Sequence, residues 1–239
     1  WQRLPNHLLA VGNQAGANAV YFSAESLARV AGLLHDMGKY SLQFKKRLAG
    51  ENIRVDHATA GAKVVMKKYG QLGKLLAYAI AGHHAGLANC IDAGQGRSTL
   101  KERLALDFGN EIPRIDDTWL QEINLPEKLP HPPLKMAAGF EGFQCAFFIR
   151  MIYSCVVDAD YLDTDKFYLG LKGKSPARND FPNLAALRDK LNETLLEKRA
   201  RVLEKLPSQV NELRQRILLH CRSQASLPPG LFSLSVPTG

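Results

Sequence analysis

Apolar residues recur along the chain with helical spacing almost throughout. Between residues 23 and 35 they are three and four positions apart, so one face of a predicted helix carries Leu27, Val30, Ala31 and Leu34. Ser23 precedes this face and is predicted to be the N-cap of the helix. A second helix, opened by Asp56 and closed by Gly70, and a third over residues 72–83 follow from the same spacing.

The middle and the C-terminal part of the chain are patterned differently. The middle is richer in glycine, proline and charge, which predicts loops with short helices near residues 100–108 and 118–123. A long apolar run predicts a helix over residues 136–163. The charged, amphipathic pattern over residues 184–225 predicts two helices separated at Pro207. Taken together, these patterns predict an all-α fold.

The last residues depart from the helical spacing. After the breaker at 228–230, residues 231–239 read LFSLSVPTG, an alternating pattern typical of a strand. A lone strand has no partner in an all-α domain, and its final Thr-Gly is where a phosphate-binding loop could begin. One interpretation is a frayed tail. The other, which we prefer, divides the chain into a domain over 1–182, a helical connector over 183–230 and the first strand of a truncated further domain.

The basic balance of the chain indicates a polyanionic partner. The formal net charge is +8, and the basic residues are clustered at positions 45–47, 67–68, 172–174 and 198–201. Such clusters are an electrostatic footprint of nucleic-acid binding. The alternative is that they are solvated helix faces, so charge alone does not decide between the two.

Cysteine usage and hydropathy favour a cytoplasmic protein without a membrane span. The four cysteines form no CxxC pair, which favours reduced thiols in a cytoplasmic protein over a zinc ribbon or a disulfide scaffold. The first residues lack the layout of a signal peptide. The most apolar stretch, residues 140–157, contains Glu141 and Arg150, so we interpret it as a buried core helix and expect no membrane span.

Histidines and aspartates lie at the ends of the predicted helices, in the segments LLHDMGK, DHATAGA, AGHHAGL and CVVDADYLDT. Imidazole and carboxylate are ligands that suit first-row transition metals. Asp36 can present one oxygen to each of two ions, and a two-metal site is able to activate water against a phosphodiester. Lys39 lies three residues after Asp36, where it could neutralise charge on the scissile phosphate. The candidate metal ligands are His7, His35, Asp36, His57, His83, His84 and Asp160.

These residues, in this order, resemble the HD nuclease domain that precedes the helicase of type I CRISPR systems. The resemblance covers residues 7 to about 165, and the truncated strand is similar to the start of that helicase. It implies an HD-superfamily helical domain with a dinuclear metal site. By resemblance, one ion would be held by His7, His35, Asp36 and Asp160, and the other by Asp36, His57, His83 and His84.

Two positions in this ligand set need separate arguments. Adjacent residues of a helix point about 100° apart, so His83 and His84 can reach one ion only if the helix ends there. The alternative is that one of them supports a ligand from behind or contacts the substrate. Asp158 and Asp160 point to nearly opposite faces of their predicted helix. Asp160 extends the apolar, inward face, so we predict that it, and not Asp158, is the ligand.

The leading hypothesis is a metal-dependent nuclease that cuts single-stranded DNA in CRISPR interference. It implies two divalent transition-metal ions (Mn, Fe, Co or Ni rather than Mg), catalytic roles for Asp36 and Lys39, and Tyr40 and Phe44 as candidates for base stacking. The implied partners are single-stranded DNA, an ATP-dependent helicase domain on the same chain and an RNA-guided surveillance complex. The alternatives are an HD phosphohydrolase that acts on small nucleotides and a non-catalytic module with a structural metal site.

Overall fold

The computed structural model describes residues 2–90, 99–175, 182–203, 208–228 and 230–236. It divides the chain into two compact units, residues 1–176 and 177–239, and each is described here by itself. The expected all-α fold is confirmed: the described residues form helices joined by turns and loops, with two isolated β-bridges and no strand. Among the described helices, none has both the length and the apolar composition needed to cross a membrane.

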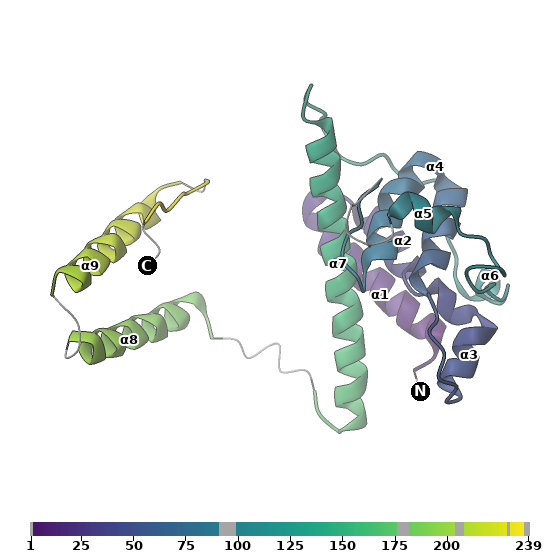
Figure 1. The fold of residues 1–239 in the computed structure, drawn as a ribbon, viewed down its shortest axis with the longest axis horizontal. Helices are drawn as coiled ribbons and strands as arrows, with labels where there is room; N and C mark the ends of the chain where they lie inside the picture. The colour runs from purple at the N-terminus through teal and green to yellow at the C-terminus, as the bar shows by residue number, and fades with distance from the viewer. Residues whose placement is uncertain (1, 91–98, 176–181, 204–207, 229, 237–239) are drawn as a thin grey trace. The chain divides into compact units, whose positions relative to one another are not determined.

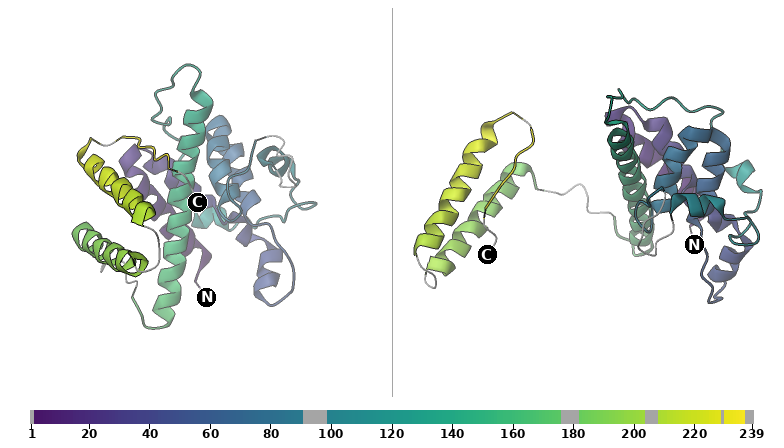
Figure 2. Two further views of the ribbon diagram at one scale, coloured as in Figure 1. Left: turned by 60° about the vertical axis from the view of Figure 1, so that its left-hand side comes forward. Right: turned by 45° about the horizontal axis from the view of Figure 1, so that its top comes forward.

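Four long helices build the core of the first unit. They are α1 (Leu4–Ala19), α2 (Glu25–Leu34), α4 (Ala58–Gly82) and α7 (Glu141–Leu171). Helix α1 packs on α2 and α7, while α4 packs on α2 and α7, so α7 lies along one side of the bundle (Figures 1 and 2). The shorter elements are η1 (Val20–Phe22), η2 (Met37–Tyr40), α3 (Leu42–Leu48), α5 (Leu100–Ala105) and α6 (Trp119–Glu122).

The end of α2 is pressed closely against α4. A Cβ atom at Gly61 would lie 1.8 Å from the carbonyl oxygen of Leu34, so only glycine permits this approach. Leu34 is fully buried, as are most of its apolar neighbours on α2. The contact fixes the residues that follow α2, His35 and Asp36, beside the helix that begins after His57.

Helix α4 has the break that the sequence predicts. Gly70 adopts φ 57° and ψ −125°, which are not helical, so the element is two helical segments joined at a kink. At its start, Asp56 Oδ1 accepts hydrogen bonds from the backbone N–H groups of Ala58 and Thr59 at 3.0 and 2.9 Å. These are two of the N–H groups that a helix start leaves without partners, so Asp56 caps α4 as predicted.

Two helices, α2 and α7, have boundaries that differ from the prediction. Ser23 is not an N-cap: its backbone is left-handed (φ 54°), it closes the turn after η1, and α2 begins at Glu25 instead. Helix α7 begins at Glu141 rather than at 136, because Gly139 has a positive φ of 83° that ends the preceding loop. It then continues to Leu171, since nothing interrupts it before Gly173, whose φ is 64°.

The second unit contains α8 (Leu184–Leu203), α9 (Ser208–Ser223) and η3 (Gln224–Ser226). Two helices were expected here, and Pro207 between them lies outside the described residues. Residues 231–236 form no strand, and no other strand lies among the described residues to offer them backbone hydrogen bonds; residues 237–239 lie outside the described part. That this segment begins a further domain, and that the two units serve as nuclease domain and connector, stay predictions.

Candidate metal centre

The predicted ligands converge on one cluster although they come from five places in the chain. The cluster draws on α1, the turn after α2, the residue before α4, the turn after α4 and the middle of α7. Ligand atoms lie within 4.8 Å of one another in three overlapping groups: Asp36 with His57, His83 and His84; His7 with His35 and Asp36; and His35 with His83 and Asp160. All seven predicted ligands are therefore brought together, and whether they bind metal stays a prediction.

The turn after α2 is held against the start of α4 by backbone contact. The N–H of Gly38 donates to the carbonyl of His57 at 2.9 Å, and a Cβ at Gly38 would lie 2.3 Å from the His57 Cα. Glycine is thus required where the two segments meet. The same close approach carries Asp36 to the side chain of His57.

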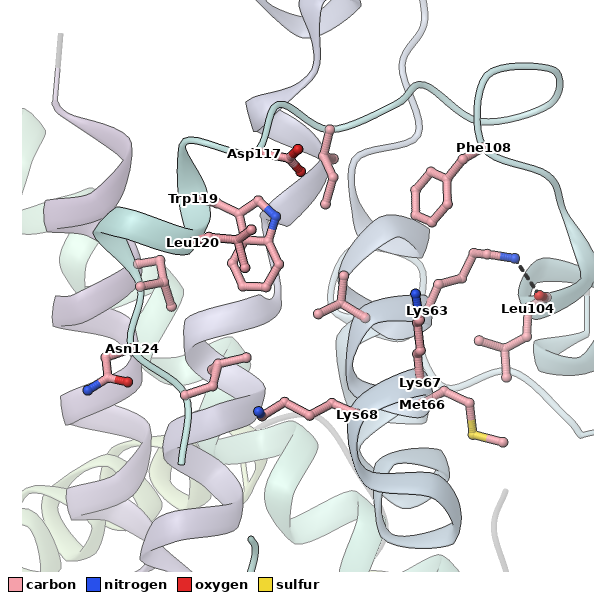
Figure 3. A pocket seen from close by; sticks show the side chains of 14 residues that line it. Lys63, Met66, Lys67, Lys68, Leu104, Phe108, Asp117, Trp119, Leu120 and Asn124 are labelled. Atoms are coloured by element: carbon pink, nitrogen blue, oxygen red, sulfur yellow. Dashed lines mark hydrogen bonds between the residues drawn. The ribbon is translucent and has the colours of Figure 1, made fainter. Parts of the chain in front are cut away.

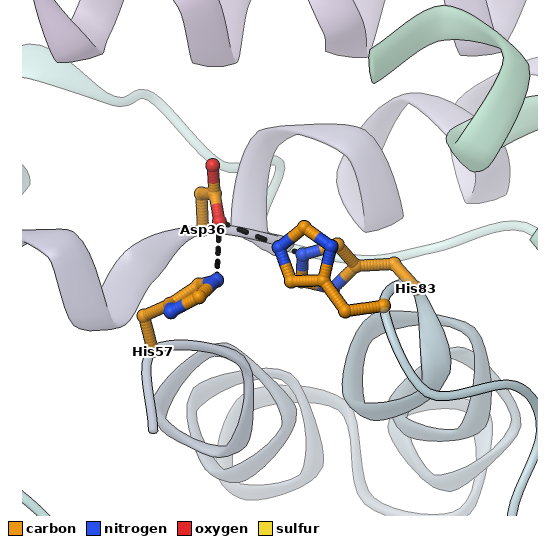
Figure 4. A group of neighbouring side chains, drawn as sticks. Asp36, His57 and His83 are labelled. Carbon is orange, nitrogen blue, oxygen red and sulfur yellow. Dashed lines mark ion pairs between the residues drawn. The ribbon is translucent and has the colours of Figure 1, made fainter. Parts of the chain in front are cut away.

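Asp36 stands at the centre of the cluster, with its two oxygens facing different histidines. Its Oδ2 lies 3.2 Å from Nε2 of His35 and 3.6 Å from Nε2 of His7. Its Oδ1 lies 3.4 Å from Nε2 of His57 and 3.5 Å from Nε2 of His83 (Figure 4). The side chain of Asp36 is 1% exposed, so water does not satisfy these oxygens. Both oxygens of this buried carboxylate therefore face imidazole nitrogens.

The imidazoles are oriented with one nitrogen inward. Nδ1 of His35 lies 2.7 Å from the Gly32 carbonyl, and Nδ1 of His83 lies 2.7 Å from the Ile80 carbonyl. A carbonyl only accepts, so each Nδ1 donates, and in the neutral ring Nε2 keeps its lone pair. Histidine ligands are commonly held by such contacts.

Several inward-facing atoms have no hydrogen-bond partner among the described residues. They are the Nε2 atoms of His35, His57 and His83, together with Oδ1 of Asp36. Buried polar atoms without partners are costly, and four in one place indicate that something else satisfies them. Because all four are metal-ligand atoms directed at one another, the residues present fit a metal site.

His7 links α1 to α7 through two aspartates. Its Nε2 lies 3.3 Å from Oδ1 of Asp160, and its Nδ1 lies 2.7 Å from Oδ2 of Asp163. Asp163 also accepts a hydrogen bond from Gln2. Asp163 is not among the predicted ligands, although its position one turn after Asp160 on the same helix face is a signal that points to it.

The structure places His83 with His84, and Asp158 apart from Asp160, as follows from the end of α4 and the faces of α7. Helix α4 ends at Gly82, so His83 and His84 lie in a turn, their ring centroids are 4.0 Å apart, and both point toward Asp36 and His57. His83 is buried and His84 is exposed. Asp158 is exposed on α7 and accepts a hydrogen bond from Asn18 at 3.2 Å, away from the cluster that Asp160 joins.

Lys39 lies at the edge of the cluster. Its Nζ is paired with Oδ2 of Asp36, because η2 is a 3-10 helix in which side chains three residues apart are aligned. Its Nζ also lies 5.7 Å from the centroid of the Phe44 ring, and that ring is 5.7 Å from the His57 ring. Phe44 therefore borders the site. Tyr40 does not: it is buried and donates to Glu122, which makes the predicted stacking role wrong.

The histidine pKa values are raised on one side of the cluster and lowered on the other. Burial lowers the pKa of His7, but hydrogen bonds to Asp160 and Asp36 outweigh it and raise the pKa to about 9. For His35, the Asp36 and Asp160 carboxylates likewise outweigh burial and raise the pKa to about 10. On the other side, burial is the main cause that lowers the pKa of His57, and burial with the neighbouring histidines lowers that of His84 to about 4.

The two carboxylates of the cluster, Asp36 and Asp160, have lowered pKa values. Burial alone would raise the pKa of Asp36, but the charge of His35 holds it well below the usual range. Burial would also raise the pKa of Asp160, but the nearby imidazoles of His35 and His7 lower it. Both aspartates are therefore ionised at neutral pH, as ligands must be.

Comparison with protein families locates a known domain in this part of the chain. Residues 5–106 match the family model of the HD domain, a range that contains His7, His35, Asp36, His57, His83 and His84. Over this range the chain is similar to HD domains. An HD domain indicates a metal-dependent hydrolase of phosphate esters and binds divalent metals through residues of this kind. Asp160 lies beyond the matched range and joins the cluster from α7. A search of curated proteins found no match.

Proposed function

We propose that the chain is a metal-dependent nuclease that hydrolyses phosphodiester bonds of single-stranded DNA. The observation that carries this proposal is the position of Asp36, whose two oxygens face separate sets of histidines. Such a set of residues would hold two divalent ions, with His7, His35 and Asp160 on one side and His57, His83 and His84 on the other. When bound, two ions supply an activated water and stabilise the leaving oxygen of a phosphodiester.

The chain's own residues would orient the substrate. Lys39 carries a positive charge directly beside Asp36, with its side chain 27% exposed, so it can contact a phosphate that enters the cluster. Phe44 flanks His57 and offers a ring face to a base. Asp36 keeps Lys39 and most of the histidines in fixed relation, because its buried carboxylate contacts Lys39, His7, His35, His57 and His83.

A basic strip next to the cluster favours a polymeric substrate. Helix α3 carries Lys45, Lys46 and Arg47, all exposed, and the Arg47 guanidinium lies 6.0 Å from the centroid of the Phe44 ring. A strand whose scissile phosphate lies at Asp36 would thus have further phosphates beside cationic side chains. A small nucleotide has no chain of phosphodiesters to extend along this strip, which is why we prefer a nuclease to a nucleotide phosphohydrolase.

The resemblance to CRISPR-associated HD nucleases extends the proposal. In that setting the chain would work with an ATP-dependent helicase domain and be recruited by an RNA-guided surveillance complex, and it would act in the cytoplasm. The helicase would deliver the single strand that the cluster cuts. The order of the ligands along the chain supports this part of the proposal.

The decisive experiment is cleavage of circular single-stranded DNA after chelation and return of Mn²⁺. Cutting a circle requires endonuclease activity, which a phosphohydrolase of small nucleotides lacks; release of phosphate from nucleotides with an intact circle would contradict the proposal. Asp36→Ala should abolish cutting and lower the bound metal while the helical circular dichroism spectrum stays nearly unchanged. Reversal of the three charges on α3 should weaken binding of single-stranded DNA in a salt-dependent way and leave the metal content unchanged.

A further inference from the structure

A cleft separate from the metal cluster opens between the first half of α4 and the segment that contains α6. Its volume is about 880 Å³ (Figure 3). The lining combines two aromatic rings, three lysines and, among the described residues, one carboxylate: Phe108, Trp119, Lys63, Lys67, Lys68 and Asp117. The cleft is thus apolar inside and positively charged, which suits a ligand with a flat ring and a negative group.

Trp119, in the aromatic part of the cleft, is held in place by contacts between α6 and the core. Trp119 begins α6, and Ile123, the residue directly after α6, is buried in the core. Glu122 accepts a hydrogen bond from Tyr40 at 2.7 Å, which ties α6 to the main body of the domain. The Trp119 ring is only partly buried, so its position is fixed while part of its surface stays accessible. A fixed, accessible indole is a platform on which a base can stack.

The cationic part of the cleft is available for a ligand. Lys67 and Lys68 are exposed, and neither forms an ion pair with any described residue. Figure 3 shows the Lys68 side chain extending from α4 toward the segment that carries Asn124. Lys63 is different, since its Nζ donates to the carbonyls of Leu104 and Leu106 and shapes the wall. Two lysines therefore remain to bind an anion beside the indole.

The cleft is connected to the metal cluster through two elements. Helix α4 starts directly after His57, so Lys63 and Lys67 lie roughly 9 and 15 Å further along its axis at 1.5 Å per residue. The loop before α6 is attached to the segment that follows Lys39: the N–H of Asp116 donates to the Tyr40 carbonyl at 3.3 Å, and its carboxylate lies 3.7 Å from Nζ of Lys45. A strand leaving the cluster could reach the cleft within a few nucleotides.

We propose that the cleft binds a nucleotide of the DNA strand that the cluster cuts, with its base stacked on Trp119 and its phosphates at Lys67 and Lys68. The proposal rests on the proposed nuclease function and adds a second point of attachment that holds the strand away from the scissile bond. A free mononucleotide offers the same ring and phosphate. The test must therefore separate a strand from a mononucleotide.

Trp119 supplies its own signal for the test. The chain has two tryptophans, so in a Trp1→Phe background the fluorescence reports on Trp119 alone. In chelator, where nothing is cut, a twelve-residue oligothymidylate should quench this fluorescence to saturation. An abasic oligonucleotide of the same length should bind without quenching. Equal quenching by thymidine monophosphate at the same concentration would assign the cleft to free nucleotides, and equal quenching by polyglutamate would assign it to acidic peptides; either result overturns the proposal.

Variants test the two parts of the cleft with a labelled oligothymidylate. Trp119→Leu should weaken binding by roughly 5- to 150-fold, the range for loss of one base stack, and Trp119→Phe should restore part of it. Lys67→Glu with Lys68→Glu should lower the salt dependence by about 0.7 log units for each lost phosphate contact. The matched control is Lys101→Glu with Lys128→Glu, which reverses two exposed charges outside the cleft and should bind as the parent does.

The same samples distinguish failure of this proposal from failure of the nuclease function. All variants should hold as much Mn²⁺ as the parent, because the cleft contributes no ligand. Quenching without any cleavage after Mn²⁺ is returned would contradict the nuclease function and leave the cleft assignment standing. Cleavage of the strand with no Trp119 quenching would overturn the cleft assignment alone.

Discussion

Nε2 of His7 lies 3.3 Å from Oδ1 of Asp160, which joins the first long helix of the domain to the last. The matched HD domain ends at residue 106, so Asp160 is outside it and yet lies within the cluster. This contact makes α7 part of the site. The closest histidine partners of Asp160 are His7 and His35, with Asp160 Oδ1 3.3 Å and 3.7 Å from their Nε2 atoms, so the loss of Asp160 should affect that side of the cluster first.

Asp160 is predicted to be needed for one of two bound ions. Asp160→Ala should lower cleavage by at least about 100-fold, since even residues that only support a ligand cost 10- to 100-fold. Its metal content should fall from about two ions per chain to about one, measured by elemental analysis after dialysis. Asp158→Ala, two residues away on the opposite face, is the control and should keep both ions and most activity. Reversed results would show that the wrong aspartate has been assigned to the cluster.

Asp163 is predicted to act through His7. Its carboxylate lies 2.7 Å from Nδ1 of His7, which fixes the ring so that Nε2 faces Asp36 and Asp160. Asp163→Ala should weaken metal binding by roughly 10- to 100-fold without removing a ligand. Activity should therefore recover at high Mn²⁺, whereas His7→Ala should not recover. If excess metal rescued neither variant, Asp163 would have a role beyond orienting His7.

The parts of this site that sequence could predict are those set by local pattern. The break at Gly70 and the cap at Asp56 follow from residues that dictate backbone geometry nearby, and the end of α4 at Gly82 allows His83 and His84 to lie together. The choice of Asp160 over Asp158 needed only the apolar face of one helix. Each of these rests on interactions within a few residues.

The parts that sequence could not predict depend on contacts between distant segments. Ser23 has the right chemistry for a cap, but packing of α1 on α2 needs a tight left-handed turn there. Tyr40 follows Lys39 in the sequence, but its ring is buried and its hydroxyl donates a hydrogen bond to Glu122, which lies far along the chain. A single sequence does not contain these pairings.

Metal binding is predicted to release protons. In the metal-free protein, the pKa values of His7 and His35 are about 9 and 10, so both carry a proton on the inward side at pH 7.5. Ligation needs the Nε2 lone pairs, and metal must displace those protons. Affinity should thus rise with pH up to about 9 to 10 and weaken as pH falls. Calorimetry at pH 7.5 in buffers of different ionisation enthalpy should count about two protons released, and about one fewer in His7→Ala; no release would mean these histidines are not ligands.

The final prediction concerns which metal supports activity. The cluster offers five imidazoles and two carboxylates, a set far richer in nitrogen than Mg²⁺ prefers, because Mg²⁺ takes oxygen ligands in a strict octahedron and retains water. Imidazole suits first-row transition metals, and binding should strengthen from Mn²⁺ toward Ni²⁺. Activity need not follow the same order, since an ion held too tightly or in an unsuitable geometry inhibits. We therefore expect Mn²⁺, Fe²⁺, Co²⁺ or Ni²⁺, added singly to chelated protein, to support nicking of circular single-stranded DNA, and Mg²⁺ alone to give little. Full activity with Mg²⁺ would mean that most of the histidines around Asp36 serve a purpose other than ligation.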